Sequence, residues 1–144
     1  MDALEHLIDE IRLTFHSLSE VAKHVNDHDI DPSARAVLEF LSIHGPTTVP
    51  DIARRRGVSR QHIQTIVNGL VDRGFVVLQP NPAHSRSHRI ALTTDGTAVI
   101  GAVLERERSL LAPFNNCHKP TTIASTATTI ASLRKFLDQI QEPT

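Results

Sequence analysis

The chain has 144 residues, of which 40% are apolar and 22% are charged, and these values predict one folded globular domain. Its longest apolar run, residues 98–104, is far shorter than the roughly 20 residues of a membrane helix, which excludes a membrane span. The acidic N-terminus lacks the basic start and apolar run of a secretory signal, so we expect a cytosolic (cytoplasmic) location. A single cysteine, Cys117, excludes a disulfide scaffold and a cysteine-rich zinc module.

The charges are distributed unevenly along the chain, although the net charge is only −1. Residues 1–31 hold eight acidic side chains against two basic ones, a net −6. Residues 51–90 hold seven arginines against two aspartates, a net +5. The basic middle segment therefore predicts a local polyanion-binding surface in a protein whose remainder has another task.

Residues 1–31 predict one long amphipathic helix. Apolar residues recur alternately three and four positions apart from Leu4 to Val25, which forms a narrow stripe. Such a stripe is typical of a helix that packs along another helix rather than over a broad core. We therefore expect this segment to be an N-terminal dimerisation helix.

A second helix is expected to follow and to run to about His44. Either Asp31 or Ser33 is suited to cap it, and Pro32 fits its first turn. The Gly45-Pro46 pair ends it. Its expected inward residues are Ala34, Val37, Leu38 and Leu41.

Residues 50–73 predict a helix-turn-helix. The helix over residues 50–56 is closed by Gly57, which supplies the left-handed conformation at a helix end. A new helix begins after its cap Ser59, so the two helices cross steeply, and Val58 is expected to fill the angle between them. The expected inward residues of the second helix are Ile63, Ile66, Val67, Leu70 and Val71.

Residues 75–93 predict a β-hairpin with an extended tip. Residues 75–79 and 88–93 are rich in β-formers, and the turn-rich loop 80–87 between them carries Arg86. A helix-turn-helix followed by such a hairpin is a winged helix, which we place at residues 32–97. In the second strand, the expected inward residues are Ile90 and Leu92, and the outward ones are Arg89 and Ala91.

Residues 98–144 are expected to complete the dimerisation region. A helix begins at Thr93 or Thr94 and runs to Leu111, and Pro113 breaks or kinks it. Apolar residues again recur three and four positions apart near the C-terminus. Because neither terminal stripe has an obvious core to join, we expect the two to bury each other across a two-fold axis. The predicted dimerisation residues are Leu4, Ile8, Ile11, Ile130, Leu133, Leu137 and Ile140.

Short motifs characterise residues 45–97. They are Asp51-Ile52-Ala53, Gly57-Val58-Ser59-Arg60, the Ile63/Val67/Leu70 register, the run from Asp72 to Val76, and Arg86 followed by Leu92-Thr93-Thr94-Asp95-Gly96. These motifs resemble the MarR family of bacterial transcriptional regulators, and the flanking helices extend the resemblance to nearly the full length. The resemblance implies a mainly α fold with a small β-hairpin, a winged helix-turn-helix with N- and C-terminal dimerisation helices. It implies a dimeric repressor that binds a pseudo-palindromic double-stranded DNA and is relieved by a small-molecule effector. The family's wing has an acidic residue where this chain has His84, so the wing's internal salt bridge is not expected.

The second helix of the helix-turn-helix is the predicted recognition helix. The side chains opposite its apolar stripe, near its N-terminus, are suited to pair with base edges in a major groove. Ser59 and Arg60 suit phosphates, as does Arg86 on the wing, and the alternative is a plain solvated helix face. Of the consecutive arginines 54–56, only one or two can face a DNA backbone at once. The predicted DNA-binding residues are Ser59, Arg60, Gln61, His62, Gln64, Thr65, Arg86, His84, His88 and Arg54.

Other classes of function find weaker support. No glycine-rich phosphate loop, zinc-protease motif or nucleophile elbow occurs, so neither an enzyme nor a cofactor is predicted. His24 and His28 have a spacing that allows a shared metal, but surface histidines are the simpler interpretation and no metal is predicted. Cys117 allows a redox role, with a structural cysteine as the alternative. The competing class is a winged-helix protein-interaction module, and the effector-binding residues are not predicted.

Overall fold

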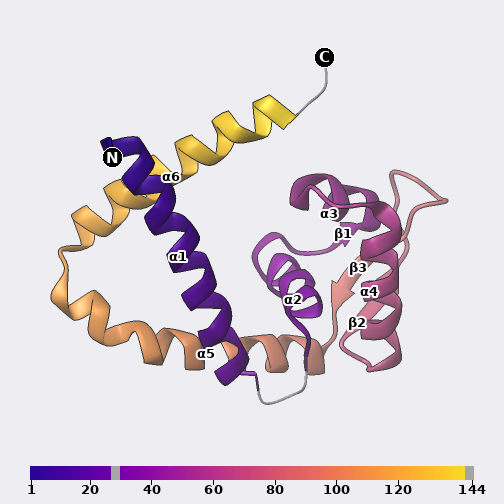
Figure 1. Cartoon of the computed structure of the whole chain (residues 1–144). Coiled ribbons are helices and arrows are strands. Elements are labelled where there is room, and N and C mark those ends of the chain that lie inside the picture. The colour runs from indigo at the N-terminus through magenta and orange to yellow at the C-terminus, as the bar shows by residue number, and fades with distance from the viewer. Residues whose placement is uncertain (27–29, 142–144) are drawn as a thin grey trace. The chain divides into compact units, whose positions relative to one another are not determined.

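The computed structural model describes residues 1–26 and 30–141, and it confirms the mainly helical winged-helix fold. The chain forms two compact units, residues 1–107 and residues 108–144, which are described separately. Within the described residues, no helix is long and apolar enough to cross a membrane. In chain order, the elements are α1 (Ala3–His24), α2 (Pro32–His44), β1 (Thr47–Thr48), α3 (Val49–Arg56), α4 (Arg60–Asp72), β2 (Val76–Gln79), β3 (Arg89–Leu92), α5 (Thr94–Cys117) and α6 (Pro120–Gln141) (Figure 1).

The core of the first unit lies where α2, α3 and α4 gather around a small sheet (Figure 1). These helices each turn one apolar face inward, and the first turns of α5 add to the same core. The central buried side chains are Val37, Leu38, Leu41, Ile52, Ile63, Val67, Leu70, Val76, Ile90 and Ile100. Burial of each larger aliphatic side chain contributes about 1.5 to 3 kcal/mol, so this cluster fixes the position of the helix-turn-helix.

The ends of α2 follow from local sequence. The Asp31 carboxylate accepts a hydrogen bond from the Ala34 N–H at 2.9 Å, and Pro32 occupies the first helical position. Asp31 is therefore the cap, of the two candidates in the sequence. At the other end Gly45, with φ of 75°, donates its N–H to the Leu41 carbonyl at 2.9 Å. The predicted bounds of this helix are confirmed.

The sheet has three strands, because β1 joins the predicted hairpin. The strand order is β1-β3-β2, and both pairings are antiparallel, with Thr47 and Leu78 opposite Ile90 from the two sides. The prediction that Ala91 faces outward is wrong, since it is buried together with Ile90. Successive side chains of a strand point to opposite faces, so both faces of β3 are covered at this point.

Two valines expected in the core are exposed. Val71 keeps 38% of its surface exposed, because it lies about 100° around α4 from the buried Leu70. Val58 is 39% exposed and does not fill the angle between α3 and α4. Ile52 and Ala53 of α3 are buried and fill that angle instead.

The segments that flank the winged helix carry few buried side chains. No residue of α1 is buried, although Val25 and Ile30 beyond its end are. The Arg106 guanidinium of α5 donates to the Val25 carbonyl at 3.1 Å, which ties the end of α1 to α5 inside the first unit.

The second unit consists of the last turns of α5 and the whole of α6. None of its described residues is buried. Pro113 does not break α5, since the helix continues through it to Cys117. Proline removes one helical hydrogen bond, to the carbonyl of residue 109, and that residue is exposed, so water can satisfy the freed carbonyl.

Candidate nucleic-acid interface

The turn between α3 and α4 is short and locally determined. Thr48 caps α3 by accepting from the Asp51 N–H at 3.3 Å. Gly57 adopts φ 66° and ψ 34°, a left-handed conformation that other residues rarely take. The Val58 N–H then donates to the Ala53 carbonyl at 3.0 Å, which closes α3 and redirects the chain into α4.

Helix α4 presents a polar, exposed face opposite its buried stripe. The Ser59 hydroxyl caps the helix by accepting from the His62 N–H at 3.1 Å, so this predicted phosphate contact also has a structural role. Among the exposed side chains, Gln64 donates to the Asn68 amide oxygen at 2.8 Å, and the Thr65 hydroxyl donates to the Gln61 carbonyl at 3.0 Å. The amide group of Gln61 belongs to the first turn, where a recognition helix approaches bases.

The wing tip is held by turns rather than by ion pairs. The Asn81 side chain accepts from the Ala83 N–H at 3.1 Å, and its carbonyl accepts from the His84 N–H at 3.2 Å. The His84 carbonyl in turn accepts from the Ser87 N–H at 3.2 Å. These bonds place Arg86 in an exposed turn, where a guanidinium can reach a DNA backbone.

A groove of about 530 Å³ lies between α4 and the wing, and we call it the inner groove. It brings together five of the residues predicted to bind DNA, three from α4 and two from the wing. Its lining combines cationic and amide-bearing side chains with apolar ones, which include Leu78 and Ile90. The five predicted residues are Arg60, Gln61, Gln64, Arg86 and His88.

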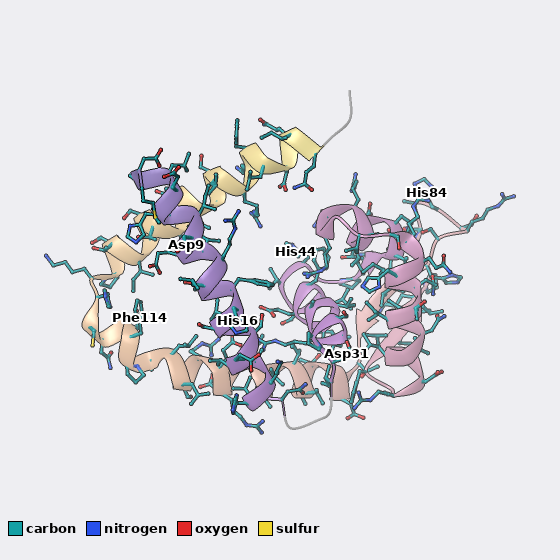
Figure 2. All side chains as sticks on the ribbon, in the orientation of Figure 1. Asp9, His16, Asp31, His44, His84 and Phe114 are labelled. Atoms are coloured by element: carbon teal, nitrogen blue, oxygen red, sulfur yellow. The ribbon has the colours of Figure 1, made fainter. Side chains whose placement is uncertain are left out.

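A second groove, of about 540 Å³, lies on another side of the wing, and we call it the outer groove. It runs between the wing and the segment from the end of α2 through β1 into α3. His84 lines this outer groove and not the inner one; Figure 2 shows it on the wing, and His44 on α2. The outer groove also includes Arg55 and Arg89, which were not among the predicted DNA-binding residues.

The three consecutive arginines of α3 lie in three different environments. Arg54 pairs with the Asp51 carboxylate at 2.9 Å, so its charge is partly satisfied within its own helix. Arg55 lies in the outer groove, with its guanidinium carbon 5.9 Å from the centroid of the Phe40 ring. Arg56 borders a third hollow. Steps of about 100° per residue separate them around the helix.

The third hollow, which we call the apolar crevice, has a volume of about 590 Å³ and lies between α1, α2 and α4. Phe15 and Leu18 of α1 line it, as do Val58 and Ile66. His62, which we expected to read bases, also lines this crevice. Lys23 at its rim donates to the Glu20 carboxylate at 2.6 Å, and that hydrogen bond and charge lower the pKa of Glu20.

An ion cluster borders the apolar crevice. The Arg35 guanidinium, whose side chain is 12% exposed, contacts Glu107 of α5 at 2.5 Å and Glu39 at 3.7 Å. Its Nη1 atom is buried and has no hydrogen-bond partner among the described residues. A buried cationic N–H without an acceptor is costly, and Arg35 is among the residues that line the apolar crevice. No periodicity in the sequence distinguishes Arg35 from an ordinary surface arginine.

The structure adds little about metal or redox chemistry. The Nδ1 atom of His24 is hydrogen-bonded to the Glu20 carbonyl at 2.8 Å, and His28 lies outside the described residues. Among the described residues, no cluster of three or more histidine, cysteine or acidic side chains is arranged to hold a metal ion. Cys117 is a free, exposed thiol. The described residues therefore give the shared-metal and redox hypotheses no additional support.

Residues 28–87 match the model of the MarR family, a segment that contains α2, the helix-turn-helix and most of the wing. The chain is also 46% identical over 59 residues to uncharacterized proteins of Mycobacterium tuberculosis and Mycobacterium bovis. That match covers 41% of this chain and 41% of each relative, so it spans less than half the length of these curated proteins.

Several solved structures are similar to this chain over nearly its whole length. The crystal structure of a MarR family transcription regulator is 27% identical, covers 99% of this chain and 100% of that one, and superposes with a TM-score of 0.70. Staphylococcus aureus MarR, in complex with salicylate and kanamycin, has a TM-score of 0.82 at 14% identity, with coverage of 94% and 92%. Streptococcus pneumoniae FabT, in complex with DNA, has a TM-score of 0.78 at 13% identity, with coverage of 96% and 99%. The last two likenesses concern the fold alone.

Proposed function

We propose that this chain, whose residues 28–87 match the MarR family model, is a homodimeric, DNA-binding transcriptional repressor of that family rather than an enzyme. The observation that carries the proposal is the inner groove, where Arg60, Gln61 and Gln64 of α4 face Arg86 and His88 of the wing. Amide groups suited to base edges and cations suited to phosphates thus converge on one surface of a winged helix.

In the proposed complex, α4 enters a major groove and the wing lies along the adjacent backbone or minor groove. Gln61 and Thr65, near the N-terminus of α4, read base edges, and Arg60 pairs with phosphate. Arg86 extends from the exposed turn of the wing toward phosphates or the minor groove. The net +5 of residues 51–90 supplies the electrostatic attraction, because each neutralised phosphate releases a counterion.

The proposed dimer explains why the terminal helices leave apolar side chains uncovered. In α1, Leu4 is 54% exposed and no residue is buried. In α6, which has no buried residue either, Ile130, Leu137 and Ile140 are exposed along one stripe. Two copies related by a two-fold axis can bury these stripes and place two α4 helices on a pseudo-palindromic operator.

We propose the apolar crevice as the effector site. Its apolar side chains suit a ring or short hydrocarbon body, and the guanidinium of Arg35, which also lines it, suits an anionic group. The crevice is formed by α1, α2 and α4, so an occupant would contact both a proposed dimerisation helix and the proposed recognition helix. A ligand regulates DNA binding only if its affinity differs between two arrangements of these helices.

Two substitutions separate base recognition from backbone binding. We expect Gln61→Ala to weaken binding to the selected operator by about 1 to 3 kcal/mol, and to weaken binding to random duplexes much less. Arg86→Ala should weaken both and flatten the salt dependence of the dimer by about two units of slope. The measurement is fluorescence anisotropy on both DNAs over a salt series, with exposed Arg134→Ala in α6 as the control. Equal losses by Gln61→Ala on both DNAs would refute the assignment of α4.

Salicylate is a suitable first probe of the effector site, because it joins a carboxylate to an aromatic ring and is bound in the S. aureus structure. We expect calorimetry to detect its binding to the wild-type protein and to an Arg60→Ala control, whose side chain lines the inner groove and not the apolar crevice. Arg35→Met, which keeps the aliphatic bulk but removes the N–H donors, should lose that binding. Unchanged binding by Arg35→Met would place the carboxylate elsewhere.

A further inference from the structure

The wing separates two cationic grooves. Arg86 and His88 line the inner groove, His84 and Arg89 line the outer groove, and Ser87 lines both. The wing therefore carries positively charged or protonatable side chains on both of its sides. The inner side faces α4 and is part of the proposed DNA-reading surface, whereas the outer side faces β1 and α3.

We propose that the outer groove is a second contact surface for duplex DNA, which binds backbone phosphates that flank the bases read by α4. The proposal rests on the proposed function, because it extends the same DNA surface outward. It assigns a role to Arg55 and His84, and it predicts a binding site longer than the segment that α4 and the inner side of the wing can cover.

The charge of the outer groove fits a polyanion. Arg55 and Arg89 both line it, and the acidic side chain in its lining, Asp51, is paired with Arg54 at 2.9 Å. His84 and His44 add side chains that can donate a hydrogen bond to phosphate and can carry a positive charge. The outer groove therefore holds two arginines whose charges Asp51 does not neutralise.

The cations of the outer groove are held in place before any DNA arrives. The Arg89 guanidinium donates to the Pro46 carbonyl at 3.2 Å, which fastens the base of the wing to the segment before β1. The Arg55 guanidinium lies against the Phe40 ring, 5.9 Å from its centroid, so a side chain that would otherwise sample many rotamers is restricted. A restricted cation loses less entropy when it meets a phosphate.

Continuity with the inner groove favours DNA as the partner over an acidic protein. Ser87 belongs to both grooves, so a duplex that meets Arg86 on the inner side is adjacent to His84 on the outer side. A minor groove is only about 6 Å wide, and its two edges are phosphate backbones. A wing at that groove has one backbone on each side, and this wing has cations on each side.

The experiment compares two lengths of the same operator. The probe is the duplex that the wild-type protein selects from random-sequence duplexes of about 40 base pairs, which is roughly four helical turns. A second form is trimmed to about 20 base pairs, which still holds two half-sites one turn apart. We expect the wild-type protein to bind the longer duplex more tightly, and Arg55→Ala to lose most of that preference.

Salt dependence gives the size of the effect. If Arg55 neutralises one phosphate per subunit, Arg55→Ala lowers the slope of the dimer on the longer duplex by about 1.8. On the longer duplex, the ratio of the wild-type affinity to that of Arg55→Ala then falls about tenfold between roughly 50 and 200 mM salt. Arg55→Lys keeps the charge and should keep the slope, which separates loss of charge from loss of the Phe40 contact.

Arg56→Ala is the matched control, since this neighbouring arginine lines the apolar crevice and not the outer groove. It should keep the wild-type preference for the longer duplex, and His84→Ala should lose part of it. Equal wild-type affinity for both lengths would overturn the proposal while leaving the proposed function intact, provided that binding still depends on Gln61 and Arg86. Failure of the wild-type protein to select any duplex would overturn both.

Discussion

Gly96, in the first turn of α5, joins the wing to that helix at a very close backbone approach. A Cβ atom built on Gly96 would lie 1.9 Å from the carbonyl oxygen of Phe75, the residue before β2. Real Cβ atoms essentially never approach closer than 3.0 Å, so Gly96→Ala requires the backbone to move by about 1 Å or more. The neighbouring atom is backbone, and therefore no side-chain rotation can relieve the contact.

The cost of that movement follows from the hydrogen bonds around it. Thr93 donates its N–H to the Phe75 carbonyl at 3.0 Å and its hydroxyl to the Gly74 carbonyl at 2.6 Å, and it accepts from the Gly96 N–H at 3.0 Å. Weakening three such bonds costs about 1 kcal/mol each, and overpacking adds about 1 to 3 kcal/mol. We expect Gly96→Ala to lower the free energy of unfolding by about 4 to 6 kcal/mol.

A second glycine of α5 provides the control. A Cβ atom added to Gly101 would have no other atom within 4 Å, and this glycine lies on the exposed side of the helix. Gly101→Ala should therefore stabilise the protein by about 0.5 to 1 kcal/mol through helix propensity. Both variants are compared by urea denaturation at one protomer concentration, because a dimer's stability depends on it. A Gly96→Ala variant as stable as Gly101→Ala would refute the close approach of α5 to the wing.

Three further predictions concern capping, the ion cluster and the dimer. Ser59→Ala removes the cap of α4 and should cost about 1 kcal/mol in urea denaturation, while a Ser42→Ala change on α2 serves as an exposed control. Glu107→Ala leaves Arg35 with only the 3.7 Å contact to Glu39 and should cost about 2 to 3 kcal/mol, somewhat less than for a fully buried pair; an unchanged unfolding midpoint would contradict the cluster. Charged substitutions at Ile130 and Leu137 should give monomer or aggregate in sedimentation, and an intact dimer would exclude α6 from the interface.

The helix-turn-helix could be predicted from local signals in the sequence. Asp31-Pro32, Gly57 and Ser59 act on the backbone within three residues of themselves, so their effect does not depend on the rest of the fold. Strand β1 had no such signal. Two residues are too few to show a period, and Thr47 becomes a strand only because β3 lies beside it.

The DNA-facing residues were harder to predict, because periodicity gives the direction of a side chain but not its neighbour. His62 and Gln61 are adjacent on the exposed face of α4, and both were expected to read bases. The fold places α1 and α2 on the side of His62, and places the wing on the side of Gln61. Only contacts between elements distant in the sequence separate the two roles.

The placement of Gln61 and His62 on different sides of α4 matters for regulation, because α4 borders both the inner groove and the apolar crevice. Gln61 and Gln64 line the inner groove, whereas His62 and Ile66 line the apolar crevice. The proposed effector and the proposed operator would thus contact different sides of one helix of 13 residues. Coupling between them then needs no long pathway, only two positions of α4 that the effector binds with unequal affinity. A tenfold change in operator affinity corresponds to about 1.4 kcal/mol, which one hydrogen bond to Arg35, made in one position and lost in the other, is able to supply.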